Sequence, residues 1–318
     1  MNRKPIAEVE SELIVDCWNG IIGEQFPMRK ELWIQNTLMD PNILSEGSVA
    51  VFEEGDLVGF VVSKVYQEEL PAVMPKETGW IQCLLVREEF RNRGIGSELL
   101  RIAEEAISNL NSRELMIGRD PQHYVPGIPL SEEASIRFFE RRGYEKETIE
   151  TDLICHVKDM DVVSLHNHET YYRVLNKDDQ AELISFLSTA FPGRWHYEAL
   201  KYFELGGQGR EFIGLFIDGT MKGFCRINDP SSPTIAQNVY WSPLFNGATG
   251  GIGPLGIERS VRGNQLGLDL VKAASNELIK RGMEHMIIDW TQLTEFYGKL
   301  GFTPWKQYQT MSKRLYSK

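Results

Sequence analysis

The feature that most constrains the fold of this chain is an internal repeat with an offset of 171 residues. Residues 86–96 recur as residues 257–267. The matching positions are Val86, Arg91, Gly96, Leu99 and Ala103 in the first copy and Ile257, Arg262, Gly267, Leu270 and Ala274 in the second. A fixed period marks a repeated structural unit, which has to be recognised before a fold is assigned. We therefore predict a tandem duplication with domains at 1–160 and 161–318, divided within the polar stretch 158–161.

In each copy, an apolar strand leads through a short turn into an amphipathic helix. In the first copy the strand is predicted at 80–86. The helix carries an apolar face at helical spacing: Leu99, Ile102, Ala103, Ala106 and Leu110. Arg91, Arg93, Gly94 and Gly96 lie between strand and helix. Glycine lets the backbone turn tightly and approach a ligand, and the first amides of a helix are unpaired and carry partial positive charge. The stretch is therefore predicted to bind a diphosphate.

Three phosphate-binding motifs compete for this stretch. The nucleotide-hydrolase loop requires G-x-x-x-x-G-K-[S/T], and no Lys-Ser or Lys-Thr follows these glycines. The dinucleotide fingerprint requires G-x-G-x-x-G, and Leu99 stands where its third glycine belongs. The pattern [R/Q]-x-x-G-x-[G/A] is matched at every position by residues 91–96, Arg-Asn-Arg-Gly-Ile-Gly. This match, set between a strand and a helix, resembles the pyrophosphate loop of the GNAT acyl-CoA N-acyltransferases.

The two halves show the same predicted order of elements, and no clear strand precedes the first helix. The first half reads as helices at 11–22 and 29–39, a hairpin at 48–52 and 57–65, the strand, loop and helix above, a strand at 114–117, a helix at 132–142 and strands in 144–157. The second half repeats this order from about residue 162. The order resembles the GNAT fold over nearly the whole chain. The resemblance implies an α/β (α+β) protein of two tandem GNAT folds, each with a mixed, mostly antiparallel sheet splayed at its fourth strand and with helices on both faces.

The resemblance also implies acetyl-CoA (CoA) as the cofactor. In the family, the pantetheine arm enters the splay and pairs with the exposed backbone of the fourth strand, whose amides polarise the thioester carbonyl. By position, the cofactor-binding residues of the first half are Leu84, Leu85, Val86, Arg91, Asn92, Arg93, Gly94, Ile95, Gly96 and Ser97. Those of the second half are Leu255, Ile257, Arg262, Gly263, Asn264, Gln265, Leu266 and Gly267. An amine attacks directly, so the enzyme must orient the reactants, let the amine lose a proton and protonate the thiolate.

The two halves differ at two positions that matter for this chemistry. The family's usual acid is a Tyr four residues before the glycine of a Y-x-x-x-G-[F/Y] helix end. Tyr297 occupies this place in the second half, and Phe139, which cannot give a proton, occupies it in the first. Conversely, Gln265 stands in the second loop where Gly94 stands in the first. Two interpretations stay open: the second half catalyses while the first binds cofactor or supports it, or the first half catalyses with another acid, such as Tyr124 or a water.

The loop 118–130 is long enough to suggest a function. Within it, His123 is a candidate base for an ammonium substrate, and Asp120 is a candidate to bind one. In the second half, Asp289, at the end of the strand after the helix, is a candidate to take the amine's proton through water, as is Glu258. The loop and the ending D-W-T-x-L-x-x-F-Y-G-K-x-G-F at 289–302 resemble tandem GNAT proteins that acetylate amino sugars. This makes glucosamine or a glucosaminide the first expected acceptor.

Composition limits the other possibilities. The 318 residues are 42% hydrophobic and 25% charged, with a net charge of −11, so nucleic acid or an anionic membrane is not expected as the main partner. The four scattered cysteines favour buried thiols in a reducing cytoplasm. We expect no signal peptide, no membrane span and no metal site, and a monomer or homodimer.

The sequence thus predicts an acetyl-CoA-dependent N-acetyltransferase that acts on a primary amine of a small molecule, in a ternary complex. Two alternatives remain. In the first alternative, the chain is a non-catalytic CoA-binding scaffold, because each half lacks one residue that the family motif expects. The third possibility is transfer to the N-terminus or a lysine of a protein.

Overall fold

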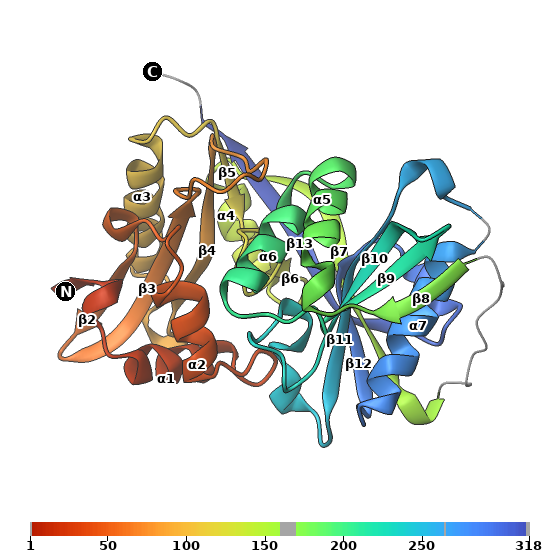
Figure 1. Ribbon diagram of the computed structural model, residues 1–318. Coiled ribbons are helices and arrows are strands. Elements are labelled where there is room, and N and C mark those ends of the chain that lie inside the picture. The colour runs from red at the N-terminus through yellow and green to blue at the C-terminus, as the bar shows by residue number, and fades with distance from the viewer. Residues whose placement is uncertain (1, 160–169, 264, 316–318) are drawn as a thin grey trace. The chain divides into compact units, whose positions relative to one another are not determined.

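The computed structural model describes residues 2–159, 170–263 and 265–315 (Figure 1). The chain forms two compact units. Unit 1 consists of Met1–Glu69, Pro75–Glu150 and Gln307–Lys318, and unit 2 consists of Leu70–Met74 and Thr151–Lys306. The domain boundary predicted at residue 160 lies outside the described residues.

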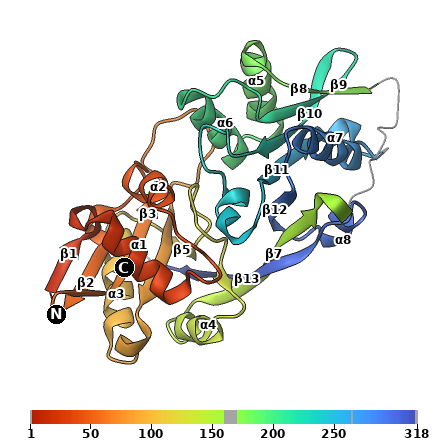
Figure 2. The ribbon, with the colours of Figure 1, turned by 90° about the horizontal axis from the view of Figure 1, so that it is seen from below.

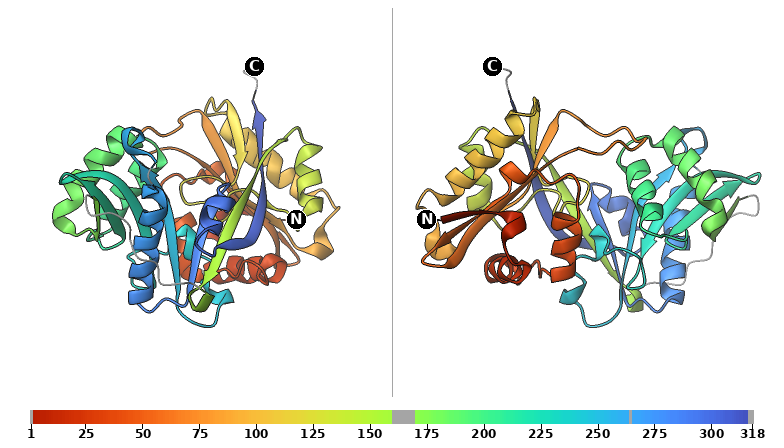
Figure 3. Two further views of the ribbon diagram at one scale, coloured as in Figure 1. Left: turned by 90° about the vertical axis from the view of Figure 1, so that its right-hand side faces the viewer. Right: turned by 60° about the vertical axis from the view of Figure 1, so that its left-hand side comes forward.

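Unit 1 is built on a sheet with the strand order β1-β2-β3-β4-β5-β13. Its elements are β1 (Asn2–Pro5), α1 (Ser11–Ile22), α2 (Lys30–Trp33), β2 (Val49–Glu53), β3 (Asp56–Val65), β4 (Thr78–Val86), α3 (Ile95–Ser108), β5 (Glu114–Ile117), β6 (Ile128–Pro129), α4 (Glu133–Glu140) and parts of β7 (Glu145–His156) and β13 (Thr303–Arg314). All neighbours in this order are antiparallel except β4 and β5, which are parallel. Helix α3 lies on one face of the sheet and α1 and α2 on the other (Figure 3).

Unit 2 repeats this arrangement with the strand order β7-β12-β11-β10-β9-β8. Its elements are β8 (Thr170–Val174), α5 (Gln180–Ala190), α6 (Arg194–Glu204), β9 (Phe212–Ile217), β10 (Thr220–Asn228), β11 (Thr249–Ile257), α7 (Leu266–Lys280), β12 (His285–Thr291) and α8 (Thr294–Gly298). Here β11 and β12 form the parallel pair. Helices α5 and α6 lie on one side of the sheet and α7 on the other (Figure 2). The predicted fold, two mixed sheets with helices on both faces, is confirmed.

The two units exchange their last strands. Leu115 of β5 pairs with Lys313 of β13, so the final segment of the chain completes the sheet of unit 1. Ile287 of β12 pairs with Ile154 of β7, so a segment of the first sequence half completes the sheet of unit 2. Met311 has no exposed surface and belongs to the apolar core of unit 1. The prediction of two consecutive domains does not include this exchange.

Most predicted elements are present, with three differences. The chain begins with the strand β1, which pairs with β2, where no strand was expected. The helix expected at 29–39 is the short α2, followed by a π-helical turn at Ile34–Leu38. Helix α3 buries Leu99 and Ala103 as predicted, but it ends at Ser108, and Leu110 beyond it is 49% exposed.

Each sheet opens at its parallel pair of strands. In unit 1 the pairing of β4 with β5 ends at Ile81 and Ile117, and in unit 2 the pairing of β11 with β12 ends at Gly251 and Ile287. Just beyond these points the fourth strand carries a β-bulge, at Gln82 in unit 1 and at 253–254 in unit 2. A bulge bends a strand and interrupts its ladder. We call the opening beyond the last pair the strand gap of each unit.

No helix among the described residues is both long and apolar enough to span a bilayer.

Candidate active site

The strand gap of unit 2 leaves bare backbone beside a carboxylate. Gly253 lies in the bulge of β11, and a Cβ atom built on it would be 3.9 Å from Oδ1 of Asp289. Asp289 lies near the end of β12, two residues past the last pair with β11. Because Gly253 has no side chain, a ligand can approach this strand closely at Asp289.

The environment of Asp289 favours its protonated form. The half-buried side chain loses hydration, and the carboxylates of Asp152 and Glu198 lie near it, so the pKa of Asp289 rises to about 7, against the opposing charge of Arg194. Asp152 accepts a hydrogen bond from the backbone N–H of Trp290 at 2.9 Å. Arg194 pairs with Glu198 at 2.7 Å. A carboxylate with a pKa near neutrality is suited to accept and release a proton.

Tyr297 lies on α8 in the same unit. It is 7% exposed and packs edge-on against Phe296 and Phe302, with ring centroids 4.9 and 6.3 Å away. Burial raises the pKa of its hydroxyl, and the nearby Cys225 and Asp289 raise it further. The hydroxyl therefore stays protonated at neutral pH and is able to donate a proton.

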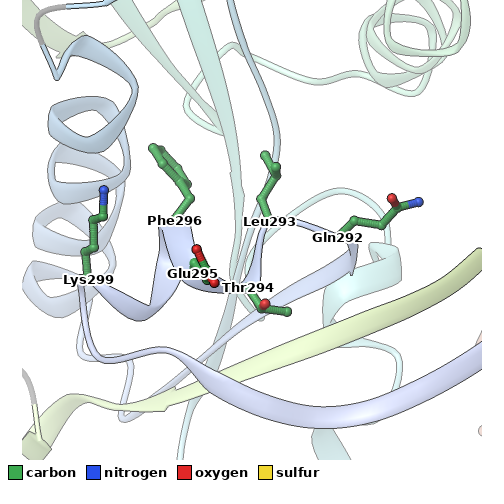
Figure 4. Close-up of a pocket in the computed structure, with 6 residues that line it drawn as sticks. All are labelled: Gln292, Leu293, Thr294, Glu295, Phe296 and Lys299. Carbon is green, nitrogen blue, oxygen red and sulfur yellow. The ribbon is translucent and has the colours of Figure 1, made fainter.

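A pocket of about 420 Å³ lies along the start of α8 (Figure 4). It is lined by Gln292, Leu293, Thr294, Glu295, Phe296 and Lys299. Leu293, Phe296 and Lys299 project to the same side (Figure 4). A Cβ atom on Gly267, in the first turn of α7, would lie 3.4 Å from the Phe296 ring. The pocket thus adjoins the predicted pyrophosphate loop of unit 2.

The two predicted pyrophosphate loops share one backbone conformation. Asn92 and Gly94 have φ values of 63° and 85°, and their counterparts Gly263 and Gln265 have 109° and 62°. The arginine that opens each loop donates from Nε to a strand carbonyl at 3.1 Å, Arg91 to Val86 and Arg262 to Ile257. Gln265 thus adopts the left-handed backbone conformation that Gly94 has in the first loop, and Gln265 is exposed. Asn264, also predicted to bind cofactor, lies outside the described residues.

Both loops are able to accept an anion on their backbone. Cβ atoms built on Gly94 and Gly263 meet nothing within 4 Å, and the loops lead into the N-termini of the long helices α3 and α7. The side chains of Ile95 and Leu266 are buried, so these residues can contact a ligand only through their backbone. The amide of Leu266 already donates to the carbonyl of Gly263 at 3.2 Å. The other predicted positions are on the fourth strands, in the first loop or in the first turns of α3 and α7: Leu84, Leu85, Val86, Arg93, Gly96, Ser97, Leu255, Ile257 and Gly267.

The predicted residues of loop 118–130 are packed inside unit 1. Asp120, His123 and Tyr124 are 0%, 2% and 2% exposed. The Tyr124 hydroxyl shares a hydrogen bond of 2.7 Å with Thr37 Oγ1, and its ring stacks on Trp33. Phe139 is also buried and packs on Tyr144. The structure therefore does not bring His123 or Tyr124 to an open surface.

Sequence reasoning missed Asp152 and Glu198. Asp152 belongs to the exchanged strand β7, and Glu198 lies on α6 four residues after Arg194. Each is distant in sequence from Asp289, and neither forms a motif with it. The local signal near Glu198 is the run of aromatic and charged residues at 194–197, which does not indicate a carboxylate partner for Asp289. Among the described residues, no three His, Cys, Asp or Glu side chains are arranged to hold a metal ion.

The profile of the "Acetyltransferase (GNAT) family" matches residues 12–144 and 180–302. The chain therefore belongs to the GNAT acetyltransferase family. It is an N-acetyltransferase with two domains of this fold, and acetyl-CoA-dependent N-acetylation is the general reaction of the family. Comparison with curated protein sequences gives no match.

Solved structures support the same fold over the whole chain. A glucosamine N-acetyltransferase region of a fungal multi-domain GH3 β-N-acetylglucosaminidase matches with a TM-score of 0.86 and 20% identity, over 98% of this chain and 38% of that one. The chain thus spans little more than a third of that protein. A tandem GNAT protein from the clavulanic acid biosynthesis pathway matches with a TM-score of 0.71 and 16% identity, over 100% and 99% of the two chains. A GCN5-related N-acetyltransferase from Sphaerobacter thermophilus matches with a TM-score of 0.69 and 16% identity, over 98% of this chain and 95% of that one.

Proposed function

We propose that unit 2 transfers the acetyl group of acetyl-CoA to a primary amine of a small molecule, with an amino sugar as the favoured acceptor. The observation that carries this proposal is the strand gap of unit 2. There the bare backbone at Gly253 lies beside Asp289, and the buried hydroxyl of Tyr297 interacts with the same carboxylate. Unit 1 has Phe139 in the place of Tyr297 and supplies no such donor.

Different residues of unit 2 bind the cofactor and transfer the protons. Acetyl-CoA, when bound, supplies an acetyl thioester that an amine attacks directly. Loop amides and Arg262 hold the diphosphate, and backbone amides of β11 beyond Gly251, where its pairing with β12 ends, polarise the thioester carbonyl. Asp289 accepts the proton that the ammonium must lose, and Tyr297 gives its proton to the departing thiolate.

The preference for a cationic amino sugar is supported by the charges near Asp289. Asp289, Asp152 and Glu198 together bring negative charge to the strand gap of unit 2. The indole of Trp290 lies next to Asp289, with the Arg194 guanidinium 4.9 Å from its centroid. Carboxylates stabilise an ammonium group. The glucosamine N-acetyltransferase region with the same fold is a further reason to place glucosamine first in the test.

A thiol-release assay with acetyl-CoA tests the proposal. The acceptor panel contains glucosamine, simple primary alkylamines and peptides with free N-termini or lysines. N-acetylglucosamine is the matched control, because its nitrogen is already acylated. We expect release with glucosamine and none with the control. Release with peptides alone would move the function to protein acetylation, and CoA binding without release on any amine would favour a scaffold.

A further inference from the structure

Unit 1 contains a fully buried lysine held by two carboxylates. Lys64, on β3, donates from Nζ to Asp40 at 2.7 Å and to Asp120 at 2.8 Å, and all three side chains are 0% exposed. Its third hydrogen bond goes to the carbonyl of Asn36 at 2.7 Å. The ammonium therefore has three acceptors for its three hydrogens.

The group is an ammonium and not a neutral amine. Burial disfavours the charged form, but the charges and hydrogen bonds of Asp120 and Asp40 outweigh it, so the pKa of Lys64 lies above its usual value. Two buried carboxylates with one cation between them form a site whose chemistry selects a primary ammonium group.

This cluster lies at the strand gap of unit 1. Gln82, the bulge residue of β4, donates from Nε2 to the same Asn36 carbonyl at 3.1 Å and to the Gln122 carbonyl at 2.9 Å. Asp120 follows β5 by three residues. A single backbone carbonyl thus joins the Lys64 ammonium to the bulge residue of the strand gap.

The repeat offset identifies the counterpart in unit 2. Gln82 corresponds to Gly253, 171 residues later, and Gly118 corresponds to Asp289. Arg119 and Trp290, the next residues, share a left-handed backbone, with φ of 66° and 46°. The gap that holds a carboxylate beside bare backbone in unit 2 is therefore filled by a glutamine in unit 1, with an ammonium–dicarboxylate cluster behind it.

We propose that Lys64 is a built-in occupant of the acceptor site of unit 1, so that this unit keeps an ammonium group permanently bound and transfers no acetyl group. The inference rests on the proposed function for the location of the acceptor amine at the strand gap. Loop 118–130, which supplies Asp120, then serves to close unit 1 and not to admit a substrate.

Removing the occupant is the direct test, with the full-length chain. Lys64→Ala leaves the two carboxylates and a cavity from which three carbons and the ammonium nitrogen, the atoms of n-propylammonium, have been removed. We expect n-propylammonium chloride at saturation to raise the thermal midpoint of Lys64→Ala by roughly 5 °C. Tetramethylammonium and sodium chloride at the same ionic strength should give no such shift. If Lys64→Ala folds poorly, its refolding yield with each salt provides the same comparison.

The matched control is Lys64→Ala combined with Asp40→Asn and Asp120→Asn, which removes both charges at nearly constant shape. Neither this control nor the wild-type chain should respond to n-propylammonium. An equal shift in all three chains, or none in Lys64→Ala, would overturn the proposed ammonium site.

A second experiment tests whether unit 1 transfers acetyl groups. In a Tyr297→Phe chain, thiol release with glucosamine should fall at least about 100-fold. Residual release above about a hundredth of wild type that disappears on adding Gly94→Glu would show transfer by unit 1 and overturn the inference. Failure of the proposed function is distinguishable, because the wild-type chain would then release no thiol with any amine, while the n-propylammonium response would still decide whether Lys64 fills an ammonium site.

Discussion

In unit 1 the residue at the strand gap is Gln82, which is 2% exposed and bonded to two backbone carbonyls, whereas in unit 2 it is Gly253, which leaves Asp289 beside open backbone. The surrounding scaffold hardly differs. Sheet order, the parallel strand pair, the bulge and the loop conformation recur in both units. A few side chains facing one gap therefore separate the proposed transferring unit from the closed one.

The same comparison shows that the cofactor loop alone does not identify an active site. The loop with the better sequence match, 91–96, belongs to the unit whose gap is filled. The loop with Gln265 keeps the same backbone and belongs to the unit with Tyr297. The following substitutions test this division of roles, from the largest expected effect to the smallest.

Tyr297→Phe removes the proposed acid without changing the packing of the ring. We expect kcat to fall by roughly 10²- to 10⁴-fold with little change in acetyl-CoA affinity, because the hydroxyl acts on the leaving group. Steady-state thiol release and calorimetric binding measure the two quantities. Phe139→Tyr in the same chain is the matched control, and recovery of turnover by it would erase the distinction between the units.

Lys64→Met removes the cation and leaves two carboxylates buried in unit 1. Breaking a buried ion pair in this way costs about 3–5 kcal/mol of unfolding free energy, to be measured by urea denaturation. Lys30→Met removes the exposed ion pair with Glu12 on the same unit and should have little effect. A small effect of Lys64→Met would mean that the cluster contributes little to the stability of unit 1.

The raised pKa of Asp289 predicts a pH dependence of activity. As Asp289 ionises, kcat/KM should increase about tenfold per pH unit below pH 7 and level off above it. Acceptors with different amine pKa values should share this break, and Asp289→Asn should abolish it. A break that follows the acceptor's pKa would assign the proton loss to the substrate.

The same shift affects stability with a defined sign. Asp289 ionises near 3.8 in the unfolded chain and near 7 in the folded one, so the folded state binds more protons between these values. Its contribution to stability is present below pH 4 and is lost as the pH rises through 7. Asp289→Asn should flatten this part of the profile of unfolding free energy against pH.

The smallest effect is expected at the loops. Gln265→Gly relieves about 1 kcal/mol of strain from the left-handed backbone at this residue. Because the loop with Gln265 already has the backbone conformation of the first loop, acetyl-CoA affinity should change by less than about threefold. Gly94→Gln is the reciprocal exchange. Gly94→Glu differs from it by a negative charge and should weaken binding in unit 1. Equal effects of Gln and Glu at 94 would assign the loss to side-chain bulk.

The sequence predicted the local features of both units because those features depend on neighbouring residues. The turn at 91–96 and the face of α3 follow from glycine positions and a helical period, and the structure has both. The filled gap depends on residues far apart: Asp40, Lys64 and Asp120 come from separate elements. Lys64 reads locally as one polar residue at the end of an apolar strand, so its burial was not predictable.

The strand exchange was unpredictable for a related reason. Both β7 and β13 are 12-residue strands that follow a helix and a glycine turn. Each of the two strands could pair with β5 or with β12, and the residues around them do not indicate which pairing forms. Asp152 belongs to the site of unit 2 because of this exchange, and no residue pattern around Asp152 predicts that it lies near Asp289.

The exchange also orders the events of biosynthesis. Leu115 pairs with Lys313, which is added to the growing chain 198 residues later. At ribosomal rates of about 5–20 residues per second, the half-finished sheet of unit 1 waits roughly 10–40 s for its last strand. During that time the ribosome produces first β7, the partner that unit 2 needs, and then β8 to β12. The part of the protein that is synthesised first is thus the part that is completed last.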